Sequence, residues 1–170
     1  MIGQYAEAAQ QTEEIRTVTQ STREPVYSMR ANSYGYNYIG STYIEVDLSS
    51  QHMYYYQNGS IIFDSDIVSG DIRYDDRATP PGIFTLYYKK SPDVLRGEKK
   101  PDGTYEYETQ VTYWMPFNGG IGFHDATWQA YLGGDRYTYA GSHGCINMPL
   151  DAAATLYSII DTNVPIVCFY

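Results

Sequence analysis

Cys145 lies in residues 142–147, which read Ser-His-Gly-Cys-Ile-Asn, and is the side chain best suited to covalent chemistry. It is one of two cysteines, and His124 precedes it by 21 residues. A buried structural thiol is one alternative, but this polar, glycine-containing segment lacks the alternation of a core strand. A histidine can take the proton of a thiol, and the thiolate then attacks an acyl carbon. Cys145 and His124 are therefore a candidate nucleophile and general base.

Metal binding is a second alternative for Cys145, because the neighbouring His143 is also a possible ligand. A zinc site commonly uses Cys-x-x-Cys or paired-histidine spacing, and this chain has three histidines and no Cys-x-x-Cys. We therefore expect no metal. The other cysteine, Cys168, lies in an apolar terminal run, where we expect a free core thiol. A disulfide between the two cysteines would disable the proposed nucleophile.

The composition excludes several classes of partner. The net charge is −9 and the pI is about 4.6, which argues against nucleic acid and against docking on an anionic membrane surface. The 20 tyrosines favour a β-rich, extracellular protein. No apolar run approaches the ~18 residues that a membrane span needs, and the first residues lack the pattern of a signal peptide. We therefore expect no direct membrane contact by this chain and an export signal or anchor outside it.

The pattern along the chain changes at about residue 40. Residues 1–40 are polar, and we expect a linker or the remnant of a preceding domain there. Later residues alternate between apolar and polar, and the pair Asn58-Gly59 indicates a two-residue hairpin turn. Strands are predicted over residues 42–48, 52–57, 60–68, 82–88, 110–117, 119–124 and 164–170. A helix is predicted over residues 149–161, and a long polar loop, residues 89–108, is predicted to form a lid or substrate edge.

His124, the 17 residues that follow it and residues 142–147 resemble the signature of the L,D-transpeptidases, the YkuD domain family. Four earlier blocks resemble the same family in the same order: residues 42–53, 67–84, 113–116 and 122–125. A lone His-Gly-Cys would be a weak signal, whereas five blocks in order are specific. The resemblance covers residues 41–170, which would be an L,D-transpeptidase catalytic domain. Residues 1–40 would then be a linker or the end of a wall-associated domain.

The resemblance implies a mainly β fold, a YkuD-type β-sandwich of mixed sheets with one packing helix near the C-terminus. It also implies 3→3 cross-linking of peptidoglycan stem peptides, without metal or organic cofactor. A cysteine attacks the third-residue carbonyl of a donor tetrapeptide, D-Ala leaves, and an amine of an acceptor stem takes the acyl group. Carbapenem β-lactams are the implied covalent inhibitors. The implied location is the cell wall on the extracellular face of a bacterial cell.

In this family a third group orients the imidazole of the base. The candidates here are the Ser142 hydroxyl and the backbone carbonyl of Asp125, and we favour Ser142. The backbone N–H groups of Gly144 and Cys145 are the expected oxyanion hole. His143 is expected to face away from the thiol, bracing the loop or helping to bind substrate.

Two further roles are expected. Residues 142–147 are called the catalytic loop below. Asn147 either ties this loop through its amide or simply precedes the helix. Of the aromatic residues around His124, we expect Tyr113 and Trp114 at the substrate wall, where they would exclude water.

Two other functions remain open on the sequence. An L,D-carboxypeptidase would use water as acceptor, so its products would lack a cross-linked dimer. A noncatalytic wall-binding module would form no thioester on Cys145. Such a module has no need for the trio of His124, Ser142 and Cys145.

Overall fold

The computed structural model describes residues 23, 25–26 and 39–170. The chain forms two compact units, residues 1–36 and 37–170, and the second unit holds all the elements discussed below. The linker or domain remnant expected over residues 1–40 falls almost entirely outside the described residues. In the described part of the chain, no helix is long and apolar enough to cross a membrane.

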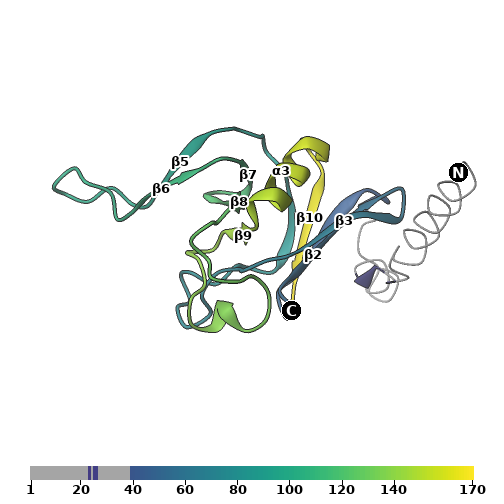
Figure 1. Cartoon of the computed structure of the whole chain (residues 1–170), viewed down its shortest axis with the longest axis horizontal. Helices are drawn as coiled ribbons and strands as arrows, with labels where there is room; N and C mark the ends of the chain where they lie inside the picture. The colour runs from purple at the N-terminus through teal and green to yellow at the C-terminus, as the bar shows by residue number, and fades with distance from the viewer. Residues whose placement is uncertain (1–22, 24, 27–38) are drawn as a thin grey trace, which may run out of the picture. The chain divides into compact units, whose positions relative to one another are not determined.

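A five-stranded sheet forms one side of the unit, in the order β3-β2-β1-β10-β4 (Figure 1). The central pair β1 and β10 is parallel, and the other pairs are antiparallel. At the β2–β3 turn, Asn58 has φ +52° and Gly59 has φ +82°. A type I′ turn needs positive φ at both positions, so the Asn-Gly prediction is confirmed. The strand bounds are β1 Tyr43–Asp47, β2 His52–Gln57, β3 Ser60–Asp66, β4 Gly82–Thr85 and β10 Pro165–Phe169.

A second, three-stranded sheet has the order β7-β8-β9, with β7 Trp114–Asn118, β8 Ile121–Asp125 and β9 Ile146–Met148. The pair β7–β8 is antiparallel and the pair β8–β9 is parallel. The helix α3, Leu150–Ile159, lies against β8, and β4 lies beside β7. These contacts join the two sheets around one core.

The core consists of side chains that face inward from both sheets and from α3. Strand alternation puts Ile166 and Cys168 of β10 inside, together with Leu156 of α3. From the second sheet, Phe123 and Ile146 are fully buried against them. The structure agrees with the predicted fold class: the unit is mostly β, its larger sheet is mixed, and one α-helix lies near the C-terminus.

Several predicted bounds were wrong. Residues 89–108, expected as a loop, include β5, Asp93–Arg96, which pairs with β6, Glu108–Val111, in a hairpin that projects from the unit (Figure 1). The predicted strand over residues 110–117 divides between β6 and β7. The predicted helix begins one residue later than expected, because Pro149 is its N-cap and has the extended ψ of 148°.

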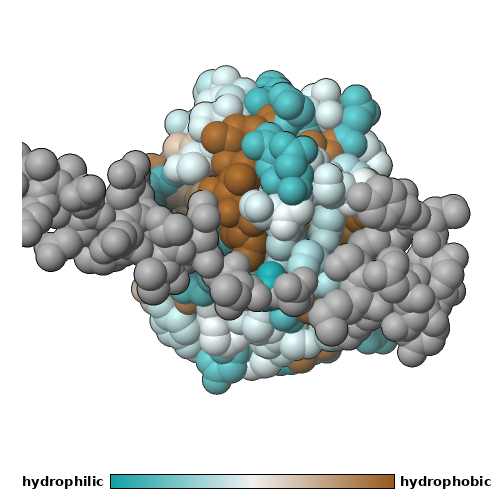
Figure 2. Space-filling view, turned by 90° about the vertical axis from the view of Figure 1, so that its right-hand side faces the viewer, coloured by the Kyte–Doolittle hydropathy of each residue, from teal (hydrophilic) through white to brown (hydrophobic). Residues whose placement is uncertain are grey.

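On the face of the molecule that Figure 2 shows, hydrophobic side chains gather in a strip beside hydrophilic ones.

Candidate active site

The sheet β7-β8-β9 brings the proposed catalytic residues onto one face. Trp114 pairs with His124 across β7 and β8, and His124 pairs with Asn147 across β8 and β9. Cys145 lies two residues before Asn147, so alternation places its side chain on the same face. Phe123 and Ile146 point to the opposite face, into the core. One apolar face thus anchors the sheet while the other presents polar side chains.

Cys145 and His124 line one cavity of about 370 Å³. Ser142, His143 and Asn147 also line it, so the structure brings together the main residues predicted from the sequence. The remaining lining residues are Leu95, Tyr107, Thr109, Trp128, Gln129, Arg136, Ala140 and Gly141. Leu95, Tyr107 and Thr109 belong to the β5–β6 hairpin and its connection, so this hairpin forms one edge of the cavity, and its role as a lid or substrate edge stays a prediction.

The imidazole of His124 is held in one tautomer. Its Nδ1 lies 2.9 Å from the backbone carbonyl oxygen of Asp125. A carbonyl can only accept, so Nδ1 carries the proton and Nε2 keeps its lone pair. Burial lowers the pKa of His124, although the Asp125 carbonyl opposes this shift. His124 is therefore a neutral base at physiological pH.

The thiol of Cys145 is also neutral in the resting site. The side chain is only partly exposed, and its Sγ lies 3.4 Å from the carbonyl oxygen of Gly120. Burial raises the pKa of the Cys145 thiol to about 11. The site therefore rests as a thiol and a neutral imidazole, so a thiolate forms only when a base takes the proton.

Ser142 does not orient the base, which corrects our preference for it. Its hydroxyl donates to the Cys145 carbonyl oxygen at 2.6 Å and accepts from the Gly144 N–H at 3.0 Å. These bonds close the loop around the nucleophile, and the Asp125 carbonyl takes the orienting position. The Gly144 N–H is occupied by Ser142, so Gly144 supports the loop, and the Cys145 N–H stays as the predicted oxyanion donor.

A buried threonine anchors the catalytic loop. The Thr79 hydroxyl donates to the Gly144 carbonyl oxygen at 2.7 Å and accepts from the Gly70 N–H at 2.9 Å. Gly144 has φ +121°, a conformation that side chains disfavour, so glycine is required at this turn. The backbone of Asn147 exchanges two hydrogen bonds with Val68, at 2.9 and 3.0 Å. The loop is thus fixed by the backbone of a neighbouring segment.

The amide of Asn147 does not tie this loop. Asn147 is 2% exposed, and its Oδ1 has no hydrogen-bond partner in the described residues. It lines the cavity, so a ligand could donate to this oxygen. His143 is exposed, and its ring contacts the Tyr107 ring with a centroid distance of 4.9 Å. His143 therefore joins the hairpin to the catalytic loop at the cavity.

The expected aromatic wall is assembled from different residues. Tyr113 packs on Tyr157 of α3 at a centroid distance of 5.1 Å, because it faces away from its neighbour Trp114. Trp114 is buried beside His124, at 6.0 Å, and does not line the cavity. Trp128 is 51% exposed, lies 5.8 Å from the His124 ring and lines the cavity. Trp128 therefore lines the cavity where Tyr113 and Trp114 were expected.

Sequence reasoning missed Tyr107, Gln129 and Arg136. Tyr107 and Gln129 lie on irregular connections and Arg136 begins a single turn of 3-10 helix, and in neither does a periodic pattern mark a functional position. The 3-10 helix η1, Arg136–Thr138, follows two glycines, which signal a turn and nothing more specific. In the described residues, no group of three or more His, Cys, Asp and Glu side chains could hold a metal ion.

The sequence matches the family model of the L,D-transpeptidase catalytic domain, YkuD, over residues 41–168. A comparison with the curated proteins finds no match.

Solved structures of relatives give the same result. The chain is 41% identical to a mutant L,D-transpeptidase from Enterococcus faecium, with a TM-score of 0.68 over 76% of this chain and 50% of that one. The alignment thus spans half of that relative. The catalytic domain of the E. faecium enzyme is also 41% identical, and the match covers 78% of this chain and all of that one, with a TM-score of 0.66. An L,D-transpeptidase from Mycobacterium smegmatis, 23% identical, shares the fold, with a TM-score of 0.62 over 76% of this chain and 59% of that one. This chain belongs to the L,D-transpeptidase (YkuD) family of enzymes.

Proposed function

We propose that this domain is a cysteine-dependent L,D-transpeptidase that forms 3→3 cross-links between peptidoglycan stem peptides. The observation that carries the proposal is the shared cavity of Cys145 and His124, with Nδ1 of His124 committed to the Asp125 carbonyl. That bond leaves Nε2 as the only basic atom of the imidazole. The base and the nucleophile are therefore held on one sheet face.

In the first half-reaction, Cys145 Sγ bonds to the third-residue carbonyl carbon of the donor stem as its proton passes to Nε2 of His124. The Cys145 N–H donates to the oxyanion that develops. The bond to D-Ala then breaks, and His124 returns the proton to the departing amine. The product is a thioester on Cys145 and free D-Ala.

In the second half-reaction, the amine of an acceptor stem attacks the thioester carbon. Its proton passes to Nε2 of His124, the carbon–sulfur bond breaks, and the proton returns to Sγ. The raised pKa of the thiol lowers the thiolate fraction more than it raises the nucleophilicity, so the first step needs a base to take the proton; it also makes the thiolate a poorer leaving group in the last step. The imidazole must therefore protonate the departing sulfur. Trp128 covers this site and would restrict the access of competing water.

β-Lactams of the carbapenem class should acylate the same thiol. The E. faecium catalytic domain has been solved acylated by ertapenem, and a related structure is a carbamoyl-enzyme formed with avibactam. The implied place of action is the bacterial cell wall, outside the cytoplasm.

Substitution of the two cysteines tests this function. With a disaccharide-tetrapeptide donor, intact-mass spectrometry should detect a thioester in wild type and in Cys168→Ala, but not in Cys145→Ala. Cys168→Ala is the matched control, because it removes the other free thiol of the described residues. Chromatography should find cross-linked dimer with the first two proteins only. Dimer formed by folded Cys145→Ala would refute the nucleophile, and tripeptide without dimer would indicate a carboxypeptidase.

A further inference from the structure

The cavity that holds Cys145 has an unusual charge for this protein. The chain as a whole carries a net charge of −9. The residues that line the cavity include no aspartate or glutamate and one permanent cation, Arg136. A cation in a partly enclosed, carboxylate-free cavity favours an anionic ligand, because few competing charges screen the field.

The guanidinium of Arg136 has no carboxylate partner in the described part of the chain. The ion pairs found there involve His52, Arg73, Lys90 and Arg96. The Nε of Arg136 instead donates to the Oε1 of Gln129. A second hydrogen bond joins Arg136 to the hydroxyl of Tyr131. An arginine has five N–H donors, so these two bonds orient the group and leave further donors for a ligand.

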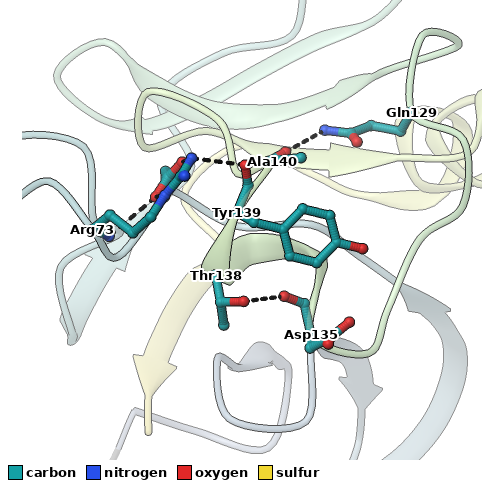
Figure 3. Close-up of polar contacts among 7 residues, drawn as sticks. Arg73, Gln129, Asp135, Thr138, Tyr139 and Ala140 are labelled. Atoms are coloured by element: carbon teal, nitrogen blue, oxygen red, sulfur yellow. Dashed lines mark hydrogen bonds and ion pairs between the residues drawn. The ribbon is translucent and has the colours of Figure 1, made fainter.

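Aromatic rings and backbone bonds hold this guanidinium in place. It lies over the rings of Tyr131 and Tyr139, at 5.0 and 5.9 Å from their centroids. Figure 3 shows how the surrounding loop is fixed. Arg73 donates to the Tyr139 carbonyl oxygen at 2.7 Å, and Gln129 donates to the Ala140 carbonyl oxygen at 3.2 Å. Gln129 therefore braces both Arg136 and the loop that carries it, and the cation is preorganised.

We propose that Arg136 binds a carboxylate of the donor stem peptide and thereby selects anionic donors. This inference rests on the proposed function. Bidentate pairing of a guanidinium with a carboxylate supplies both attraction and orientation, which a lysine ammonium would not reproduce. The carboxylate is either the terminal one, on the leaving D-Ala, or one within the stem. In both cases Arg136 positions the third-residue carbonyl against Sγ of Cys145.

The first test does not depend on transpeptidation. Iodoacetate and iodoacetamide alkylate a thiol by the same reaction, and only iodoacetate is anionic. The ratio of their rate constants at Cys145, measured by mass spectrometry of the modified peptide, reports the local field. Arg136→Gln should lower this ratio about threefold to tenfold relative to wild type. Arg136→Lys should retain most of it. Lys99→Gln, an exposed substitution with the same charge change outside the cavity lining, should leave it unchanged.

The second test identifies the carboxylate. Release of D-Ala is measured for three donors: the free acid, its C-terminal amide, and a donor amidated within the stem. Arg136→Gln should lower kcat/KM for the free acid on the order of tenfold or more. One of the two amidated donors lacks the carboxylate that Arg136 binds. For that donor, kcat/KM of Arg136→Gln and of wild type should be equal.

An unchanged reagent ratio in folded Arg136→Gln would overturn the inference, and so would equal discrimination among the donors by both proteins. The failure of the proposed function looks different. Wild type would then release D-Ala from none of the donors, while the reagent ratio would still report on Arg136.

Discussion

Thr79 offers the sharpest test of how the catalytic loop is held. Its hydroxyl joins two backbone groups that are far apart in the sequence, the Gly70 N–H and the Gly144 carbonyl. Thr79 is 1% exposed, so water cannot replace these bonds. Thr79→Val keeps the shape of the side chain but removes both the donor and the acceptor.

The cost follows from the two groups left without partners. A buried donor or acceptor that loses its partner costs about 1–3 kcal/mol, so the two together should lower the free energy of unfolding by about 2–6 kcal/mol. For a domain of this size that loss corresponds to a fall in Tm on the order of 10 °C. Thr79→Ser keeps the hydroxyl and loses only a methyl group, so it should cost about 1 kcal/mol.

The assay compares the three proteins by urea unfolding and by the rate of Cys145 alkylation. Thr79→Val should also react with altered rate while still folded, since the Gly144 carbonyl lies next to the nucleophile in the chain. If Thr79→Val is as stable as Thr79→Ser, the two hydrogen bonds do not anchor this loop and the reasoning is wrong.

Three other outcomes are expected. Cys168→Ala should lose about 1 kcal/mol of stability and keep its activity, because Cys168 lies in the core; loss of turnover in a folded protein would show that its role is different. His124→Ala should slow alkylation of Cys145 by iodoacetamide at pH 7 far more than His143→Ala does. The difference in rate from wild type should shrink as the pH approaches the thiol pKa of about 11. A larger loss of rate in His143→Ala than in His124→Ala would make His143 the base. Burial lowers the pKa of His124, so below about pH 6.5 the unfolded chain binds more protons than the folded one, and stability should fall as the pH falls. In urea unfolding from pH 7.5 to 5, His124→Gln should lose less stability than wild type, and parallel curves would exclude this coupling.

The sequence predicts those parts of the fold in which local signals and burial agree. Asn58-Gly59 strongly favours a hairpin turn, and the continuous apolar run of β10 matches its place in the core. The hairpin β5–β6 escaped prediction because both of its strands are largely polar, so its side chains show no contrast between a core face and a solvent face.

In the candidate site too, residues marked by a local sequence signal were predicted, whereas those placed by tertiary structure were not. Cys145 and His124 follow from residue chemistry and a specific motif. The orienting role of Asp125 does not, because it belongs to a backbone carbonyl, which every residue possesses. The choice of Tyr113 failed because neighbouring residues on a strand point in opposite directions, and only the sheet shows which of them meets α3. Arg136 enters the cavity from the short 3-10 helix η1, whose position tertiary contacts fix.

The parallel pair β1–β10 constrains the order in which this domain folds. β10 lies between β1 and β4, so the last of the described strands takes an interior position in the largest sheet. Ile44 pairs with Ile166, and this contact closes nearly the whole domain into one loop. Closing so long a loop costs conformational entropy before the contact can stabilise the sheet. The early hairpin β2–β3 can form locally, but the sheet stays divided until synthesis reaches β10. A nascent chain that stalls before residue 165 would expose the edges of β1 and β4, and truncation there should yield an aggregating protein rather than a weaker enzyme.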